Sequence, residues 1–556
     1  MARRIRWQIV IAVVSSLLII GLLTQLAFTT LAVSQPLTGG SYVEAVTSMP
    51  VQVVPPLNTP LSDPTGRDVG ALLFDGLTRI GLDGLPEGAL AEDWDIEQNG
   101  EVYLFYLRPN VTWHDGERFT ADDVVFTIRS IQDEQFPGDP SLQAFWSNVQ
   151  VDRIDDLTVR FTLTAPFAPF LAAARQPMMP AHLLQDIPLD QWATSNFAQQ
   201  PVGTGPYRLN TWANEQIVLE ANPDYYAGRP FIDRLELRSI ESPQMAFSEL
   251  VNAQVEALAF STAAAPELGQ VALPATVRRL TLPLDEYVIL TFNMRAAPLA
   301  DLAFRVALAQ GLDKASLIEQ VHGGQVARLD TPMLPGWWAY DEGIQWHTFD
   351  PLAAAQALEA LGYNLNDEGV RVRDGQPLQL SLITDGDLGR IAAAEEVARQ
   401  WGSLGVAVEI EPLDAATLRE RLRTRDFTLA IHGWARLGPD PDVFELWHSS
   451  QAESGLNYAG LQDETIDEFL ASGRTDQELA ERIEDYRLFQ QRWVELTPSI
   501  TLYQPLYTFT TSDAVNGVGF EDALARRDIF FGREDRYRNI TRWFINSSQE
   551  VRGTLR

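Results

Sequence analysis

The histidines of this sequence do not form a pattern that catalysis or metal binding requires. There are six of them, and His432 and His448, the closest pair, are spaced so that they do not share one face of a helix. The chain contains no cysteine, which excludes thiol nucleophiles, thiolate metal sites and disulfides. The motifs of serine hydrolases, zinc proteases, nucleotide-binding loops and EF-hands are absent. We therefore expect no catalytic residue, no metal and no cofactor.

Two local combinations of residues have both a chemical and a structural interpretation. His114 and Asp115 resemble a catalytic dyad, but an Asp-Gly pair after a strand is typical of a turn, and we favour the turn. Asp440 and Asp442 flank a proline, and they either ligate a metal or cap helices around a proline turn. Carboxylate pairs for sugar hydrolysis can lie far apart along a chain, so the sequence leaves a glycosidase open.

Aromatic residues are a more informative group. Trp337 and Trp338 are adjacent in a Pro-Gly-Trp-Trp loop, and neighbouring loop side chains do not both point into one core. We expect at least one of the two to line a surface or cleft, and we take Trp337 as a candidate ligand contact. The alternative is a tryptophan that fixes a long loop to its domain.

The N-terminus predicts a membrane anchor. Three arginines within residues 1–6 precede residues 7–33, an uncharged run long enough to cross a bilayer. The basic flank places the first six residues in the cytoplasm. A signal peptide with a weak cleavage site near Ser34 is the alternative. We predict a cytoplasmic stub (1–6), a transmembrane helix (7–33) and a polar linker (34–41), in a single-pass cell-membrane protein whose bulk is extracytoplasmic.

The net charge of the chain excludes some classes of binding partner, and its length predicts the number of domains. The chain has 75 acidic and 42 basic residues, a net charge of −33, which repels nucleic acid and anionic lipid headgroups. Its 556 residues predict two or three domains. Because only a short stub is expected in the cytoplasm, a ligand bound outside must be passed to another protein.

The elements that position these residues follow from hydrophobic periodicity. We predict strands at 42–46, 103–108 and 158–164, a hairpin of 207–212 with 216–221, and a helix from Thr120 with a capping box to Asp123.

The second half of the chain alternates regularly between strands and helices. Strands are predicted at 378–384, 406–411 and 427–432, with helices at 388–404 and 414–424 between them. This order indicates a parallel sheet covered on both faces, and ligands of such sheets bind beyond the carboxyl ends of the strands. Trp434 stands at that end of the third strand.

Six segments, taken in order, resemble the family of extracellular solute-binding proteins for peptides, nickel and oligosaccharides. They are residues 71–94, 107–131, 201–209, 222–232, 292–317 and 433–444. The resemblance implies an α/β fold, a two-lobed periplasmic-binding-protein clamshell of type II with an extra inserted domain. It implies a discontinuous lobe I (42–84, 201–293 and 499–556), an inserted domain (85–200), lobe II (294–498), and hinge crossings at 285–293 and 499–507.

The resemblance also implies a binding site around the Gly-Trp motif. Peptide-binding members carry an aspartate three positions after this tryptophan, which pairs with the peptide ammonium, and this chain has Leu437 there. Ile431 stands where an arginine can occur. We therefore expect a free α-amino group to bind weakly. The expected ligand-binding residues are Trp434, Ala435, Arg436, Leu437, Asp440, Asn457, Trp337, Phe74 and Asn58.

The function that the resemblance implies is transport without catalysis. The chain would be the substrate-binding component of an ABC importer, closing its lobes on a small solute (a peptide, an oligosaccharide or another polar ligand) and delivering it to the permease and ATPase complex. The alternatives are an extracytoplasmic glycosidase or esterase, and a ligand sensor that uses the same clamshell.

Overall fold

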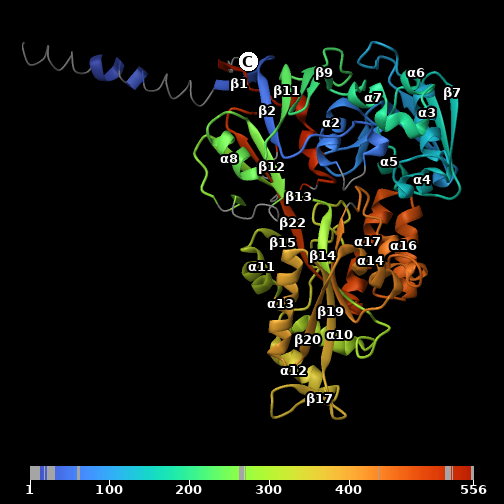
Figure 1. Cartoon of the computed structure of the whole chain (residues 1–556), viewed down its shortest axis with the longest axis vertical. Helices are drawn as coiled ribbons and strands as arrows, with labels where there is room; N and C mark the ends of the chain where they lie inside the picture. The colour runs from blue at the N-terminus through green and yellow to red at the C-terminus, as the bar shows by residue number, and fades with distance from the viewer. Residues whose placement is uncertain are drawn as a thin grey trace, which may run out of the picture.

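A computed structural model shows the protein as two lobes stacked along the long axis of the molecule (Figure 1). The described residues are 13–17, 19–21, 32–58, 63–261, 268–269, 271–435, 437–519, 528 and 530–551. Each lobe has a large cluster of buried hydrophobic residues, one that includes Tyr42 and Trp543 and another that includes Tyr287 and Trp493. The predicted two-lobed α/β architecture is confirmed, and the upper and lower lobes of Figure 1 are called lobe I and lobe II below.

One sheet, twelve-stranded within the described residues, continues through both lobes. Its long strand β22 (Ser499–Ser512) pairs in its first half with β14 (Glu286–Phe292) and in its second half with β12 (Ala257–Ser261) and β13 (Val277–Pro283). In Figure 1, β22 passes from the lower lobe into the upper one. Three strands of this sheet lie within residues 379–435 and are described below. The others are β2 (Ser41–Val46), β9 (Tyr207–Ala213), β10 (Gln216–Ala221), β11 (Arg234–Ser239) and β15 (Val326–Arg328).

Lobe II contains the predicted alternation of strands and helices. Its elements are β19 (Gln379–Asp385), α13 (Leu388–Gly402), β20 (Ala407–Leu413), α14 (Ala415–Thr424) and β21 (Leu429–Ala435). Strand β19 pairs in parallel with both β20 and β21, as predicted. The sheet is mixed, however, because β21 also pairs antiparallel with β14. This second pairing extends β21 beyond its predicted end, so that Trp434 lies within the strand, opposite Tyr287.

The rest of lobe II is mainly helical. Its elements are α10 (Leu302–Gln310), α11 (Lys314–His322), α12 (Pro351–Ala360), α15 (Phe444–Trp447), α16 (Glu464–Thr475), α17 (Leu479–Leu496) and the small sheet of β16 (Asn364–Leu365), β17 (Arg371–Arg373) and β18 (Gln376–Pro377).

Residues 85–200 include a four-stranded antiparallel sheet in the order β5-β6-β8-β7. The strands are β5 (Ala91–Glu97), β6 (Val102–Leu107), β7 (Val149–Asp155) and β8 (Thr158–Leu163). Helix α3 (Ala121–Gln132) packs on it, and the predicted capping box of Thr120 and Asp123 is present. The remaining elements of lobe I and this region are α2 (Pro64–Leu73), β3 (Thr78–Ile80), β4 (Pro86–Gly88), α4 (Pro140–Trp146), α5 (Phe170–Ala173), α6 (Ala181–Leu184), α7 (Asn196–Gln199) and α8 (Pro243–Val251).

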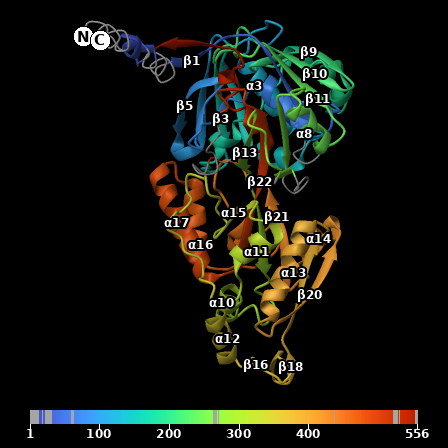
Figure 2. The ribbon, with the colours of Figure 1, turned by 90° about the vertical axis from the view of Figure 1, so that its left-hand side faces the viewer.

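Residues 85–200 contact helix α16 of lobe II, which lies beneath them in Figures 1 and 2. The backbone N–H of Ala168 donates to the carbonyl of Arg474 at 2.9 Å. The guanidinium of Arg474 lies 5.7 Å from the ring centre of Phe167. Direct polar and aromatic contacts therefore join the lobes on this side.

Most of the predicted membrane anchor, residues 7–33, lies outside the described residues. Residues 13–17 and 19–21 are helical. The structure shows no membrane-spanning helix in the part of the chain that it describes. Residues 34–41, predicted as a linker, partly belong to strand β1 (Ala32–Pro36), which pairs antiparallel with β23 (Ser547–Val551). Backbone pairing with a distant segment gives this polar stretch an order that its composition does not predict.

Candidate functional site

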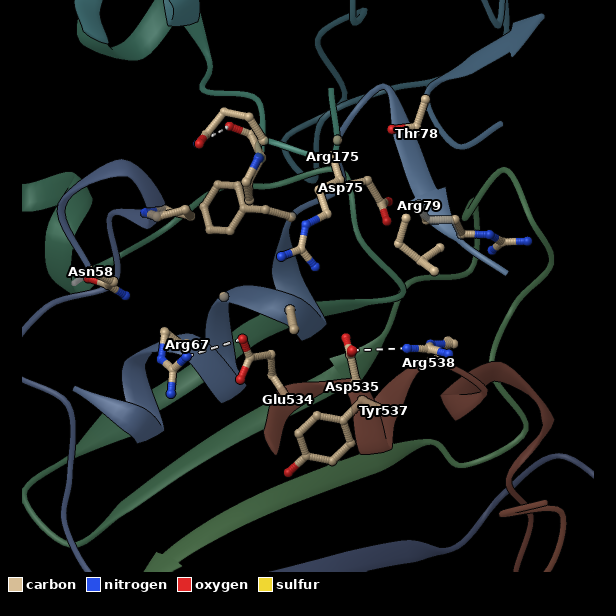
Figure 3. A pocket seen from close by; sticks show the side chains of 18 of the residues that line it. Asn58, Arg67, Asp75, Thr78, Arg79, Arg175, Glu534, Asp535, Tyr537 and Arg538 are labelled. Atoms are coloured by element: carbon tan, nitrogen blue, oxygen red, sulfur yellow. Dashed lines mark hydrogen bonds and ion pairs between the residues drawn. The ribbon is translucent and has the colours of Figure 1, made fainter. Parts of the chain in front are cut away.

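A cavity of about 590 Å³ opens in lobe I beside the junction of the two lobes (Figure 3). Its wall includes η1 (Pro55–Leu57), α2, β3, Asp139 with α4, residues 172–177 and residues 534–541. Ile80 and Ala172 of this wall also belong to the hydrophobic cluster of lobe II. The volume is within the range of about 300–1,000 Å³ that is typical of small-molecule sites.

Gly76 allows two segments of the wall to meet at one end of the cavity. A Cβ atom at this position would lie 2.4 Å from the carbonyl oxygen of Arg175, so a larger residue would push the segments apart. The backbone N–H of Met178 donates to the carbonyl of Asp75 at 3.0 Å. These backbone contacts hold Asp75 and Arg175 near each other, and Figure 3 shows the guanidinium of Arg175 directed into the cavity.

Asp75 has a carboxylate oxygen without a partner. Oδ1 accepts a hydrogen bond from the Tyr225 hydroxyl at 3.4 Å, whereas Oδ2 is covered and has no hydrogen-bond partner among the described residues. Burial raises the pKa of Asp75 to about 6, against the opposing effects of Arg79, Tyr225 and Tyr226. At neutral pH the group is ionised in surroundings that disfavour the charge, and a cationic partner would relieve this cost.

Asp139 of the wall caps α4 and accepts from the backbone N–H of Ser141 at 2.7 Å. Three arginines of the wall are paired with carboxylates within the protein. The pairs are Arg67 with Glu534 at 3.3 Å, Arg538 with Asp535 at 2.9 Å, and Arg79 with Glu87 at 2.7 Å. Arg175 differs, because its guanidinium stacks 5.9 Å from the ring centre of Phe531 and makes no ion pair within the described residues. No group of the described residues hydrogen-bonds to the buried Oε2 of Glu534, and burial raises the pKa of Glu534.

A fully buried charge cluster supports this wall from behind. Arg536 donates from Nη1 to Asp68 Oδ1 and from Nη2 to Glu44 Oε1, each at 2.7 Å, and all three side chains have no exposed surface. The hydroxyl of Tyr537 donates to Glu44 Oε2 at 2.9 Å. The cluster joins α2, β2 and η5 (Arg533–Tyr537), and so it fixes the positions of Arg67 and Glu534 in the cavity wall.

Trp434 lies in lobe II and does not line this cavity. It is half-buried and stacks on Tyr458, with ring centres 5.3 Å apart and an interplanar angle of 17°. The ring of His432 meets it edge-on at 5.3 Å. Burial lowers the pKa of His432 to about 4, so this histidine is neutral at physiological pH. The aromatic group is a flat surface near the carboxyl end of β21.

The other predicted ligand contacts lie in several different places. Asn58 and Phe74 line the cavity. Trp337 is 3% exposed and belongs to the core of lobe II, so the packing favours the alternative in which it fixes its loop. Ala435 ends β21, Leu437 packs against the lobe II core, and Arg436 lies outside the described residues.

Asn457 and Asp440 make contacts within lobe II. Asn457 is buried, and its amide donates to the carbonyls of Trp447, His448 and Leu461, which is a loop-stabilising arrangement. Asp440 accepts from Arg482 at 2.6 Å.

The sequence left open a catalytic dyad at His114 and Asp115 and a metal site at Asp440 and Asp442, and the contacts of these residues favour structural roles. His114 accepts from the backbone N–H of Gly203 at 3.1 Å, while Asp115 faces His182 at 2.9 Å, so His114 and Asp115 do not form a dyad. Asp442 pairs with Arg474 at 2.8 Å, which agrees with a structural role beside the proline turn. The part of the chain that the structure describes has no group of three potential metal ligands.

Sequence reasoning missed the charged residues of the cavity. Asp75 stands in segment 71–94, which resembles the family, directly after Phe74, but a single acid in a turn carries no local signal of a site. Glu534 and Arg538 belong to a charge-rich stretch near the C-terminus, which was a possible signal.

Comparison with known proteins assigns the chain to a family. The sequence pattern described as "Bacterial extracellular solute-binding proteins, family 5 Middle" matches residues 86–455. The chain belongs to this family. It is 25% identical over 494 residues to the oligopeptide-binding protein AppA of Bacillus subtilis, covering 87% of this chain and 88% of that protein. It is 30% identical over 461 residues to protein XP55 of Streptomyces lividans, covering 80% of each.

Solved structures show the same fold. HbpA2 from Haemophilus parasuis matches with a TM-score of 0.77 and 22% identity, over 86% of this chain and 96% of that one. AppA from Bacillus subtilis, solved with a nonapeptide, matches with a TM-score of 0.66 and 24% identity, over 92% and 100%. As a family 5 solute-binding protein, the chain is the substrate-binding component of an ABC importer, works outside the cytoplasm and is not an enzyme.

Proposed function

We propose that this family 5 protein captures a short peptide or a similar small polar solute between its lobes and delivers it to the permease and ATPase of an importer. The observation that carries the proposal is the cavity at the lobe junction, whose volume suits a small solute and whose wall carries charges of both signs. Relatives are named for oligopeptides and for di- and tripeptides. A relative from Haemophilus influenzae is named for heme, so the solutes of the family are diverse.

The proposed hinge between the lobes is the pair of strands β14 and β22. Residues 285–293 and 499–507 contain β14 and the first half of β22, and β22 has pairing partners in both lobes. Bending of this pair would move lobe II toward the cavity of lobe I, which is hinge closure. The Trp434 surface would then become the second wall of the site.

Ligand binding is expected to compact the protein. Closure about the hinge brings the lobes together, so small-angle scattering should show a smaller radius of gyration when a solute found by thermal-shift screening is added at saturation. A solute that does not shift thermal unfolding is the control and should leave the curve unchanged. An unchanged curve with a saturating, bound solute would contradict hinge closure.

The membrane anchor is a separate part of the proposal. Residues 7–33 are uncharged and follow three arginines, so we expect the mature protein to keep them and to fractionate with membranes. Mass analysis of the protein from its native host checks this. A mature N-terminus near Gln35 would show instead that the segment is a cleaved signal peptide.

A further inference from the structure

We propose that the cavity binds a zwitterionic solute, with Asp75 receiving its ammonium group and Arg175 receiving its carboxylate. This inference rests on the proposed function and specifies the ligand chemistry of the same site. It places both charged contacts on lobe I, so the solute can dock there before lobe II closes over it.

The pairing of charges in the cavity wall points to this ligand. Arg67, Arg79 and Arg538 each have a carboxylate partner within the protein. Arg175 has none among the described residues, and its guanidinium is directed into the cavity (Figure 3). Asp75 has one covered oxygen, Oδ2, to which no group in the described ranges donates a hydrogen bond. Arg175 and Asp75 are therefore a cation and an anion of the wall that have no ion-pair partner among the described residues and that a ligand could satisfy together.

An unpaired charge in a partly enclosed site costs free energy because it loses contact with water. The positions of such charges therefore indicate which charges a ligand would carry. Asp75 and Arg175 belong to adjacent wall segments, yet the structure shows no ion pair of 4.0 Å or less between them. A ligand that carries both charges would satisfy both groups at once. Arginine also suits a carboxylate because its planar guanidinium can donate two parallel hydrogen bonds.

Asp75 changes the expectation drawn from Leu437. That expectation concerned lobe II, where the ammonium-binding aspartate of peptide-binding members is replaced by leucine. Asp75 supplies an anion on the opposite lobe, and Glu534 adds a second buried carboxylate oxygen without a partner. A free amino group thus has a binding partner in this chain, at another position.

The experiment compares blocked and unblocked peptides on matched variants. A panel of di- and tripeptides with free termini is measured by calorimetry on the full chain, alongside the same panel N-acetylated or C-amidated. With the wild type, each block should weaken binding at least tenfold. In Asp75→Asn, N-acetylation should no longer weaken binding, whereas C-amidation should still weaken it. In Arg175→Gln, C-amidation should no longer weaken binding, whereas N-acetylation should still weaken it. Arg153→Gln and Asp156→Asn, exposed surface changes, are the controls and should keep both effects.

The pH dependence provides an independent readout. Binding of the free peptides should weaken as the pH falls through about 6, because protonation of Asp75 removes the anion. Around this carboxyl lie Arg79 on β3, Tyr225 and Tyr226 in the turn after β10, and Arg175 on the neighbouring wall segment. Arginine and tyrosine do not titrate in this range, so Asp75→Asn should flatten the profile between pH 5 and 7.

The outcomes separate this inference from the proposed function. Equal affinity for free and blocked peptides would overturn the zwitterion site and leave the peptide receptor standing. If blocking the peptide termini weakens binding to Asp75→Asn and Arg175→Gln as much as it does to the wild type, the assignment of these two residues is wrong. If no peptide of the panel binds, the inference and the peptide class of the proposed function both fail.

Discussion

Replacing Arg536 by methionine is expected to lower the free energy of unfolding by about 3–5 kcal/mol. Within the described residues, the substitution removes the only guanidinium that pairs with the buried carboxylate of Glu44. It also removes one of the two guanidiniums that pair with the buried carboxylate of Asp68, which keeps Arg533 at 2.7 Å. Desolvated, unpaired charges are among the most destabilising features of a folded protein. Chemical denaturation of the purified protein, monitored by tryptophan fluorescence, measures the effect.

Two comparisons make the Arg536 result specific. Arg153→Met, on the surface of the inserted region, should change stability by less than about 1 kcal/mol because exposed ion pairs contribute little. Replacing Arg536, Asp68 and Glu44 together by apolar residues of similar volume should recover part of the loss, since the two buried carboxylates are removed with the guanidinium and only Arg533 then lacks its partner Asp68. A loss below about 1 kcal/mol for Arg536→Met alone would show that water or another cation compensates the carboxylates.

The cluster also affects acid stability. Burial by itself would raise the pKa of Asp68, but the guanidiniums of Arg533 and Arg536 outweigh burial and lower it. A carboxyl with a lowered folded-state pKa stabilises the fold above its unfolded value of about 3.9, and this contribution is lost as the pH falls through the folded value. The acid-induced loss should therefore be smaller in the triple apolar variant.

Trp434→Ala is expected to weaken solute binding at least tenfold, or roughly 1.4 kcal/mol. The indole is half-buried near the carboxyl end of β21, stacked on Tyr458, and lobe closure would bring its face over the cavity. A flat apolar ring with one donor suits a sugar ring or an apolar side chain. Calorimetry with a solute identified by thermal shift measures the change.

Two variants separate binding from folding at this position. Trp434→Phe keeps an aromatic face and should retain most of the affinity. Trp434→Ala should unfold at nearly the wild-type denaturant concentration, because the side chain lies at the edge of the core of lobe II. Unchanged affinity in Trp434→Ala would exclude this residue from the site, and a large loss of stability would indicate a packing role.

The local secondary structure was predictable from the sequence. The capping box at Thr120, the hairpin of β9 and β10, and the β19-α13-β20-α14-β21 unit depend on neighbouring residues and hydrophobic periodicity, and the structure contains each of them. The family motifs, read in order, also implied the two-lobed fold. These features depend on interactions within short segments, which the order of residue types encodes directly.

Only the tertiary structure decided which charged residues meet in the cavity. Arg67 and Glu534 form an ion pair although they are 467 positions apart, and Arg175 in the same wall has no ion-pair partner in the part of the chain that the structure describes. In the sequence, these residues look like any surface charge, because pairing and desolvation depend on which distant segments pack together. The sequence by itself therefore determined the elements, the family and the absence of cysteine chemistry, whereas the long-range packing of α2, residues 172–177 and η5 determined the electrostatics of the candidate site.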